Sequence, residues 1–267
     1  MKIAFCYNGK LRGGKDDQYS IESLKKHSKD MCHNHFKCDS YDIYCHSWHP
    51  SLSKEIDEIL KPVRSIHEPE QDFQVSVTSI DMIFHDMKNS KRHKLPFFDY
   101  IKNFHTFSKD FQSVEHLYRY YSNAKSIKKV VNLVKESNIE YDVLVLCRYD
   151  SKINKTIDMT LCDLNFVYVL QKGLTQNELY DGNEIIKRTH IFPELIMSSF
   201  KNIHEYTDTL LEHIDLYRSM FRSYKNFYKG KRSFYDHAWK SYHLEHTLGL
   251  EIKQLEHHDM STFETIR

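Results

Sequence analysis

A short apolar run near the middle of the chain constrains the fold more than any other feature. Residues 142–147 read Asp-Val-Leu-Val-Leu-Cys, and Arg148-Tyr149-Asp150 follows directly. The run has no helical periodicity and is too short for a buried helix, so it predicts a strand that is buried on both faces. Open α/β sheets bind their ligands outside the carboxyl ends of such strands. The charged residues after the run are therefore a candidate binding site, and a loop salt bridge between Arg148 and Asp150 is the simpler alternative.

The segments around this run alternate between strand and helix patterns. Strands are predicted at 2–7, 41–48, 63–66, 166–170 and 250–255, and helices at 19–29, 56–60, 112–137, 194–216 and 234–247. An alternation of this kind predicts a parallel sheet that is covered by helices. Residues 173–183 are expected to form a polar loop, and residues 70–110 an irregular or helical insertion.

The composition fits one soluble α/β domain. The chain has 267 residues, of which 40% are hydrophobic, and this is enough for a sizeable core. Lys and Arg number 38 and Asp and Glu 37, a net charge of +1 that argues against nucleic-acid binding driven by bulk charge. The first apolar run, residues 3–7, is too short for a signal peptide or a membrane span, so a cytoplasmic protein is expected.

The cysteines predict buried thiols rather than disulfides. None of the six forms a Cys-x-x-Cys pair, and Cys6, Cys45 and Cys147 each fall within an apolar run. Buried free cysteines behave as small hydrophobic residues, so reduced thiols in a reducing compartment are predicted. The alternative is a compact zinc site with four neighbouring ligands, which would be Cys32, His33, His35 and Cys38.

A glycine-rich turn follows the first predicted strand. Residues 8–14 hold three of the seven glycines and precede a predicted helix. Backbone N–H groups in such a turn, with a helix N-terminus behind them, form an anion site. The turn lacks both Gly-Lys-Ser/Thr and G-x-G-x-x-G, so a plain tight turn is the alternative.

Aromatic residues suggest two further contacts. Tyr7 and Trp48 stand at the ends of predicted strands, where a ring can stack on a base or a sugar, and a core position is the alternative for Trp48. Residues 218–232 combine basic and aromatic residues. That segment predicts contact with a membrane surface or an anionic acceptor, and the solvated face of a helix is the alternative.

Four motifs occur in one order along the chain. They are Asn8-Gly9-Lys10-Leu11-Arg12, then Asp42-Ile43-Tyr44-Cys45-His46-Ser47-Trp48, then Tyr121-Ser122-Asn123-Ala124-Lys125 before Arg148-Tyr149-Asp150, and last Tyr242-His243-Leu244-Glu245. This order resembles a family of small bacterial and viral glycosyltransferases of the GT-A type. Those proteins commonly show Ser-Gly-Gln-Leu-Arg, a strand ending His-Thr-Trp, Tyr-Ser-x-x-Lys before Arg-Phe-Asp or Arg-Pro-Asp, and Tyr-His-Leu-Glu. The resemblance covers most of the chain except residues 70–110.

The resemblance implies a single GT-A-like domain over residues 1–267, with a Rossmann-like, mostly parallel sheet and a helical C-terminal part. Residues 1–170 would bind a nucleotide-sugar donor, and residues 171–267 would form the acceptor side. The implied donor-binding residues are Tyr7, Asn8, Gly9, Arg12, Trp48, Tyr121, Lys125, Arg148, Tyr149 and Asp150. Asp150 would also hold Mn²⁺ or Mg²⁺, which would offset the charge of the leaving diphosphate.

The expected function is transfer of a sugar from a nucleotide-diphosphate donor to a hydroxyl of a glycan, such as a surface polysaccharide or a glycoprotein. The candidate catalytic residues are Asp150, Asp181, His190 and Glu194, with Asp236 and His237 as further candidates for the base. The family's usual Asp-x-Asp has only one acid here, which leaves metal dependence and the identity of the base open. The alternatives are another nucleotide-dependent transferase and a non-catalytic nucleotide- or glycan-binding module on the same fold.

Overall fold

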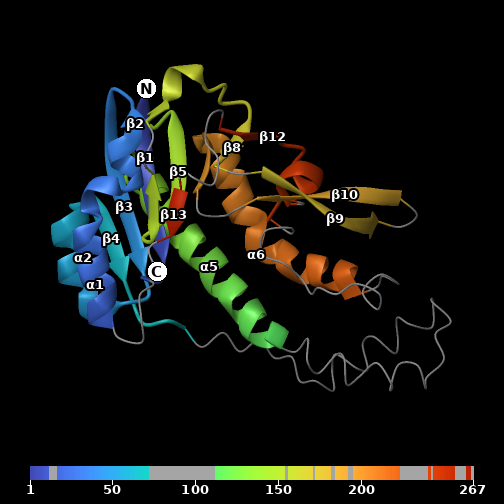
Figure 1. Cartoon of the computed structure of the whole chain (residues 1–267), viewed down its shortest axis with the longest axis horizontal. Helices are drawn as coiled ribbons and strands as arrows, with labels where there is room; N and C mark the ends of the chain where they lie inside the picture. The colour runs from blue at the N-terminus through green and yellow to red at the C-terminus, as the bar shows by residue number, and fades with distance from the viewer. Residues whose placement is uncertain are drawn as a thin grey trace.

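A computed structural model describes residues 1–11, 17–71, 112–153, 156–170, 172–181, 184–191, 195–222, 240–241, 243–255 and 263–265 (Figure 1). These residues contain a seven-stranded sheet with the strand order β12-β8-β11-β5-β1-β3-β4. The strands are β1 (Lys2–Gly9), β3 (Ser40–Ser47), β4 (Arg64–His67), β5 (Val143–Arg148), β8 (Val167–Val169), β11 (Leu195–Ser199) and β12 (Ile252–Gln254).

All strands of this sheet except β11 run parallel. β1 pairs in parallel with both β3 and β5, β3 pairs in parallel with β4, and β12 does so with β8. β11 is antiparallel to both of its neighbours, β5 and β8. The predicted mostly parallel α/β sheet is therefore confirmed, as are the strands expected at 2–7, 41–48, 63–66, 142–147, 166–170 and 250–255.

Among the described residues, four helices of eight or more residues cover the two faces of the sheet (Figure 1). α1 (Asp17–Lys26) and α2 (Ser53–Leu60) pack on one face, and α5 (Gln112–Lys135) and α6 (Phe200–Arg222) pack on the other. Short 3-10 segments lie at Ser28–Asp30, Cys32–His35, Pro50–Leu52 and Met159–Leu161, and a π-helical turn at His243–Thr247. The helices predicted at 19–29, 56–60 and 112–137 are confirmed, with ends that differ by a few residues.

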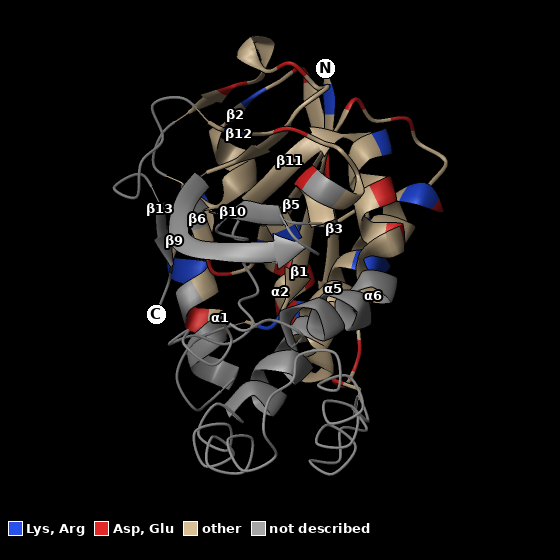
Figure 2. Cartoon of the chain, turned by 90° about the vertical axis from the view of Figure 1, so that its right-hand side faces the viewer, with Lys and Arg blue, Asp and Glu red and all other residues tan. Residues whose placement is uncertain are grey.

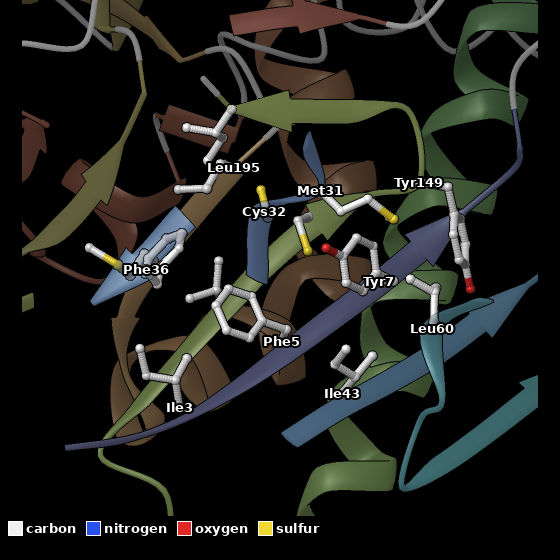
Figure 3. Packing of buried hydrophobic residues seen from close by; sticks show 14 of the residues in the cluster. Ile3, Phe5, Tyr7, Met31, Cys32, Phe36, Ile43, Leu60, Tyr149 and Leu195 are labelled. Atoms are coloured by element: carbon white, nitrogen blue, oxygen red, sulfur yellow. The ribbon is translucent and has the colours of Figure 1, made fainter. Parts of the chain in front are cut away.

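The alternation of side chains along the strands creates two cores. Ile3, Phe5 and Tyr7 of β1 face α1 and α2, where they join Val143 and Val145 of β5 (Figure 3). The intervening residues of the same strands face α5 and α6; they include Ala4, Cys6, Leu144 and Leu146. Because both faces are covered, the central strands are apolar at nearly every position, and this explains the run that dominates the sequence.

The structure corrects two predictions in the second half of the chain. Residues 195–199 belong to β11 rather than to a helix, and α6 begins only at Phe200. The strand is favoured there because it fills the position between β5 and β8, where Leu195, Ile196 and Met197 become buried on both faces of the sheet. Residues 173–183, expected as a polar loop, fall mostly in β9 (Lys172–Asp181), which pairs antiparallel with β10 (Glu184–Ile191).

Both ends of the β9–β10 hairpin lie at the same edge of the sheet. β8 runs parallel to β5, so the chain leaves β8 at the edge where the carboxyl ends of the parallel strands lie. It returns to that edge because Leu195, the first residue of the antiparallel β11, stands opposite Cys147 near the end of β5. Two small pairs complete the described structure, β2 (Phe36–Lys37) with β7 (Ile157–Asp158) and β6 (Ser151–Ile153) with β13 (Phe263–Thr265).

Some predicted features lie mostly outside the described residues. Of the insertion at 70–110 only residues 70–71 are described, and of the basic segment at 218–232 only residues 218–222, at the end of α6. Of the last predicted helix, residues 240–241 and 243–247 are described. The proposed division into a donor half and an acceptor half stays a prediction, and β11 and β12 of the second half share one sheet with the strands of the first.

Replacing Leu144 by Ala should destabilise the protein by about 2–5 kcal/mol, because Leu144 is fully buried between β5 and α5 and its loss leaves a cavity. Leu161 is 83% exposed and offers a matched control, since Leu161→Ala should change the stability by less than about 0.5 kcal/mol. Urea denaturation of the two variants measures the difference. Equal stabilities would contradict the placement of β5 at the centre of the fold.

Candidate functional site

The candidate site lies where the strand order of the sheet changes direction. From β1 the chain moves outward to β3 and then β4, whereas β5 lies on the opposite side of β1. Open α/β sheets bind ligands in the crevice outside the carboxyl ends of the strands at such a point. The residues at these two ends are Asn8 and Gly9 of β1, Arg148 at the end of β5, and Tyr149 and Asp150 directly after it.

At this edge the last row of side chains across β3, β1 and β5 is polar, whereas the rows before it are apolar. Asn8 stands in register with His46 of β3 on one side and with Arg148 of β5 on the other. Two residues earlier, the corresponding row consists of Cys6, Tyr44 and Leu146, all within the apolar core beneath α5. Because alternate residues of a strand face the same side, the polar row also lies on the α5 side of the sheet.

Ser126 of α5 ties this row to the helix. Its hydroxyl oxygen accepts a hydrogen bond from the backbone N–H of Gly9 at 2.7 Å and lies 2.7 Å from Nδ1 of His46. Because the carboxylate of Glu68 can only accept, Nε2 of a neutral His46 carries the ring proton, and Nδ1 accepts a hydrogen bond from the hydroxyl of Ser126. Nε2 then faces Oε1 of Glu68 at 3.3 Å. A continuous chain of hydrogen bonds thus joins β1, α5, β3 and the segment after β4.

Burial keeps His46 neutral. Desolvation lowers the pKa of the fully buried His46 to about 4, although its hydrogen bond to Glu68 acts in the opposite direction. Partial burial raises the pKa of Glu68, but hydrogen bonds with Lys129 and His46 outweigh that effect and lower it. The ion pair between Glu68 and Lys129 therefore neutralises the carboxylate beside a neutral imidazole.

A second hydrogen-bonded chain reaches the row from the C-terminal part of the protein. Nζ of Lys240, which is fully buried, donates to Oδ1 of Asn123 at 2.7 Å, and Nδ2 of Asn123 donates to Oδ1 of Asn8 at 3.4 Å. Nδ2 of Asn8 donates in turn to the carbonyl oxygens of Cys147 and Cys6, at 3.0 and 3.3 Å. The amide of Asn8 is thus engaged within the protein, and it holds the ends of β1 and β5 together.

A third chain of hydrogen bonds lies at the end of β3, on the face of the sheet opposite to His46. Oγ of the buried Ser47 lies 2.7 Å from Nδ1 of His67, and Nε2 of His67 lies 3.0 Å from Oδ1 of Asp57 in α2. The end of β4 is therefore held to β3 on both faces of the sheet.

Arg148 and Asp150 form the salt bridge that the sequence offered as its simpler interpretation. Nε of Arg148 donates to Oδ1 of Asp150 at 2.8 Å, and its Nη2 contacts Oδ2, so both carboxylate oxygens are engaged. The side chains are 2% exposed for Asp150 and 13% for Arg148. A bidentate pair in this environment is strong and directional.

The Mn²⁺ or Mg²⁺ expected at Asp150 stays a prediction, which this conformation does not favour. Both oxygens of its carboxylate are already bound by Arg148. Within the part of the chain that the structure describes, no three His, Cys, Asp or Glu side chains gather to hold a metal ion. The same finding removes the zinc alternative at residues 32–38, where His33 instead contacts the hydroxyl of Tyr7 at 2.9 Å.

The aromatic candidates are core residues. Tyr7 and Tyr149 are buried in the core beneath α1 and α2, with ring centroids 5.8 Å apart (Figure 3). Trp48 is buried too, and its ring packs edge-on at 4.5 Å against His46. The core interpretation of Trp48 is confirmed. Neither Tyr7 nor Trp48 exposes its ring for stacking on a base or a sugar in this conformation, and their role in donor binding stays a prediction. Tyr121 is partly buried against the core under α5 and remains a candidate.

Three lysines face the same edge. Lys10 follows β1, and Lys125 and Lys129 lie on α5. Each contacts a side chain from the segment after β4: Lys10 pairs with Glu70, Lys125 donates to Gln71 at 2.6 Å, and Lys129 pairs with Glu68. Of these lysines, only Lys125 was predicted to bind the donor. The segment 68–71, which meets all three of them, was not identified from the sequence.

Of the candidates for the catalytic base, Asp181 and His190 belong to the described residues, and they lie at different ends of the β9–β10 hairpin. In the hairpin register Asp181 faces Glu184 next to the turn, whereas His190 faces Gly173 near the base. Gly173 and Asp181 are eight positions apart along the strand, a length of roughly 27 Å. Since the hairpin base lies at the carboxyl edge of the sheet, the backbone of His190 is the nearer of the two. Glu194 and Arg12 lie outside the described residues, as do Asp236 and His237.

No protein-family model matches this chain, and a comparison with curated proteins finds no significant match. Among the described residues, no helix is both long enough and apolar enough to cross a membrane.

The stability of the protein should fall as the pH is lowered from about 6.5 to about 4. Burial lowers the pKa of both His46 and His33 from 6.5 to about 4, so in this window the unfolded chain binds protons that the folded chain does not. Each histidine then contributes up to about 1.4 kcal/mol of lost stability per pH unit. Chemical denaturation at successive pH values should show a shallower slope for His46→Gln. The variant His27→Gln, at a half-buried histidine, is the control, and an unchanged slope in His46→Gln would contradict the neutral relay.

Replacing Arg148 by Met should destabilise the protein by about 3–5 kcal/mol, because the buried carboxylate of Asp150 loses its guanidinium. The double variant Arg148→Met/Asp150→Asn should recover part of this loss, which is the signature of a coupled pair. Arg64→Met provides the control: Arg64 pairs with Glu136 at 3.1 Å, but both side chains are exposed, so its loss should cost less than about 1 kcal/mol. Additive effects of the two substitutions at 148 and 150 would argue against the pair.

Proposed function

We propose that the chain is a glycosyltransferase that moves a sugar from a nucleotide-diphosphate donor to a hydroxyl of a glycan acceptor, such as a surface polysaccharide or a glycoprotein. The observation that carries this proposal is the polar row at the switch point of the sheet, His46–Asn8–Arg148, with Lys10 and Lys125 beside it. A sheet of this topology binds nucleotides at that place, and the cations suit a diphosphate. The GT-A resemblance of the motifs at residues 8–12, 42–48, 121–125 and 148–150 supports the same reading, because the described residues 8–10, 46–48, 121–125 and 148–150 of these motifs lie at this edge.

Glycosyl transfer breaks the bond between the anomeric carbon of the sugar and an oxygen of the terminal donor phosphate. Negative charge develops on the leaving diphosphate, and positively charged groups fixed beside it lower the barrier. Lys10, Lys125 and Arg148 are described cations at this edge. Because Arg148 engages both oxygens of Asp150, we assign the stabilisation of the leaving group to these side chains rather than to a metal at Asp150.

The acceptor hydroxyl must lose its proton as the new bond forms, and a carboxylate or a histidine performs this step in an inverting enzyme. Asp150 is a poor base in this conformation because Arg148 holds both of its oxygens. The position of His190 near the base of the hairpin favours it over Asp181, and Glu194 directly precedes β11 in the sequence.

The same observation at Asp150 favours one alternative, a non-catalytic module that binds a nucleotide or a glycan on this fold. A carboxylate that is fully engaged by an arginine contributes to structure rather than to chemistry. Turnover separates the two functions: a transferase releases nucleoside diphosphate from its donor, and faster with an acceptor, whereas a module binds the donor and leaves it intact.

The test is a thermal-shift screen against nucleoside diphosphates and nucleotide-sugars, with and without Mn²⁺. A donor present at about a hundred times its Kd should stabilise the protein by roughly 2.7 kcal/mol and raise the melting temperature. Lys125→Ala should reduce this shift, because Lys125 lies at the carboxyl edge, whereas Lys135→Ala removes the same charge from the far end of α5 and should leave it unchanged. If no nucleotide or nucleotide-sugar raises the melting temperature, the donor site is wrong.

A further inference from the structure

The chain segment that follows β4 lies across the candidate site. It leaves the sheet after His67 and passes along α5 (Figure 1). Residues 68–71, Glu-Pro-Glu-Gln, are here called the strap. The first residue of the strap, Glu68, is held in place by its backbone and its side chain. Its backbone N–H donates to the carbonyl oxygen of Ser47 at 3.1 Å, and its side chain contacts His46 and Lys129.

Glu70 places a carboxylate between the loop after β1 and α5. Its Oε2 pairs with Nζ of Lys10, and its Oε1 accepts a hydrogen bond from Oγ of Ser122 at 2.7 Å. The side chain of Glu70 is only 19% exposed. An ammonium and a hydroxyl that converge on one anionic group are the kind of donors that bind a phosphate oxygen. The carboxylate therefore stands where an anionic ligand of the candidate site would be held.

Gln71 extends this arrangement along the helix. Its Oε1 accepts a hydrogen bond from Nζ of Lys125 at 2.6 Å, one turn from Ser122. Lys10, Ser122 and Lys125 are here called the anion row, and the strap supplies an oxygen acceptor to each of its members. The strap therefore contacts this row at three side chains, and not through a single salt bridge.

The surrounding charge does not account for the pairing. The chain has a net charge of +1, and Figure 2 shows acidic and basic residues interspersed over the described part of the molecule rather than gathered by sign. Lys10 is 49% exposed, and exposed ion pairs contribute only about 0–1 kcal/mol. The contact between Lys10 and Glu70 is therefore weak enough for a doubly charged ligand to replace it.

We propose that the strap is a built-in competitor: Glu70 and Gln71 occupy the anion row, and a diphosphate binds there by displacing them. The choice of a diphosphate rests on the proposed function. Occupation by the strap gives the lysines partners while the site is unliganded, and it selects for ligands that carry more charge than one carboxylate. Glu68 stays in place because it is also part of the His46 relay, so the displacement begins after Pro69.

The experiment measures the affinity for inorganic pyrophosphate by titration calorimetry at one pH and one ionic strength, because salt screens these contacts. Glu70→Gln removes the competing charge and keeps the shape of the side chain, so pyrophosphate should bind about tenfold more tightly, a gain of about 1.4 kcal/mol. Gln71→Glu adds a competing charge opposite Lys125 and should weaken binding. Glu136→Gln makes the same charge change as Glu70→Gln at the exposed partner of Arg64, and it should leave the affinity as in the wild type.

Equal or weaker pyrophosphate binding by Glu70→Gln would overturn the proposal, and so would the absence of pyrophosphate binding in both the wild type and the variant. A tighter affinity that appears equally in Glu136→Gln would also overturn it, because the effect would then come from net charge alone. Melting temperatures of all variants, measured in parallel, establish that each is folded.

Nucleotide-sugars in the same titrations separate this proposal from the proposed function. If Glu70→Gln tightens pyrophosphate binding but no nucleotide-sugar binds, the proposal for the strap is supported and the assignment of the donor is wrong. If nucleotide-sugars bind equally well to the wild type and to Glu70→Gln, the donor site holds and the strap is only a structural contact.

Discussion

The hydroxyl of Ser126 carries the contact on which the whole polar edge depends. It accepts from the N–H of Gly9 and meets the ring of His46, so one helical side chain joins the ends of two strands. Gly9 has φ of 96°, a left-handed conformation that favours glycine, and this conformation turns the chain away from the sheet after β1. A buried N–H, a buried hydroxyl and a buried imidazole each obtain a partner, which removes the large cost of leaving such groups unpaired. The position of α5 over the sheet is thereby fixed at the same point where the core ends.

The site is built from pairs that are already satisfied. Arg148 is held by Asp150, Lys240 by Asn123, and the strap residues meet the lysines of the edge. Their burial differs, and this sets how readily each pair can be exchanged. The Arg148–Asp150 pair is enclosed and costly to break, whereas the contacts around Lys10 are half open to water. Ligand binding should therefore rearrange the strap side of the edge and leave the β5 side in place.

The fold followed from the sequence wherever burial left a periodic signal. The run at 142–147 predicts a strand that is buried on both faces, and the apolar stripe of 112–137 predicts a helix that is buried on one face. The hairpin was missed although Gly182-Asn183, the dipeptide between the paired residues Asp181 and Glu184, is a common sequence signal for a tight hairpin turn. β11 was missed because three apolar residues directly before a helix are compatible both with a short strand and with the first turn of that helix. Only the tertiary structure, in which a strand is needed between β5 and β8, distinguishes the two.

The site was harder to foresee, for a different reason. Ser122, Ser126 and Lys129 recur at helical spacing, so their shared face was available in the sequence. The register that aligns Asn8 with His46 and Arg148 depends instead on crossovers of many residues, and no local pattern encodes it. The complete burial of Lys240 also runs against the general behaviour of lysine. Polar residues of a site are placed by tertiary structure more than by their neighbours in the chain.

The single reversed strand has a consequence for how such a protein can diversify. Because β11 runs against its neighbours, the chain between β8 and β11 both departs from and returns to the binding edge. Residues can be added to or removed from the β9–β10 hairpin without shifting any strand of the central sheet. The central sheet and the hairpin at its carboxyl edge can thus change independently, so a change in the surface at that edge need not be accompanied by a new core.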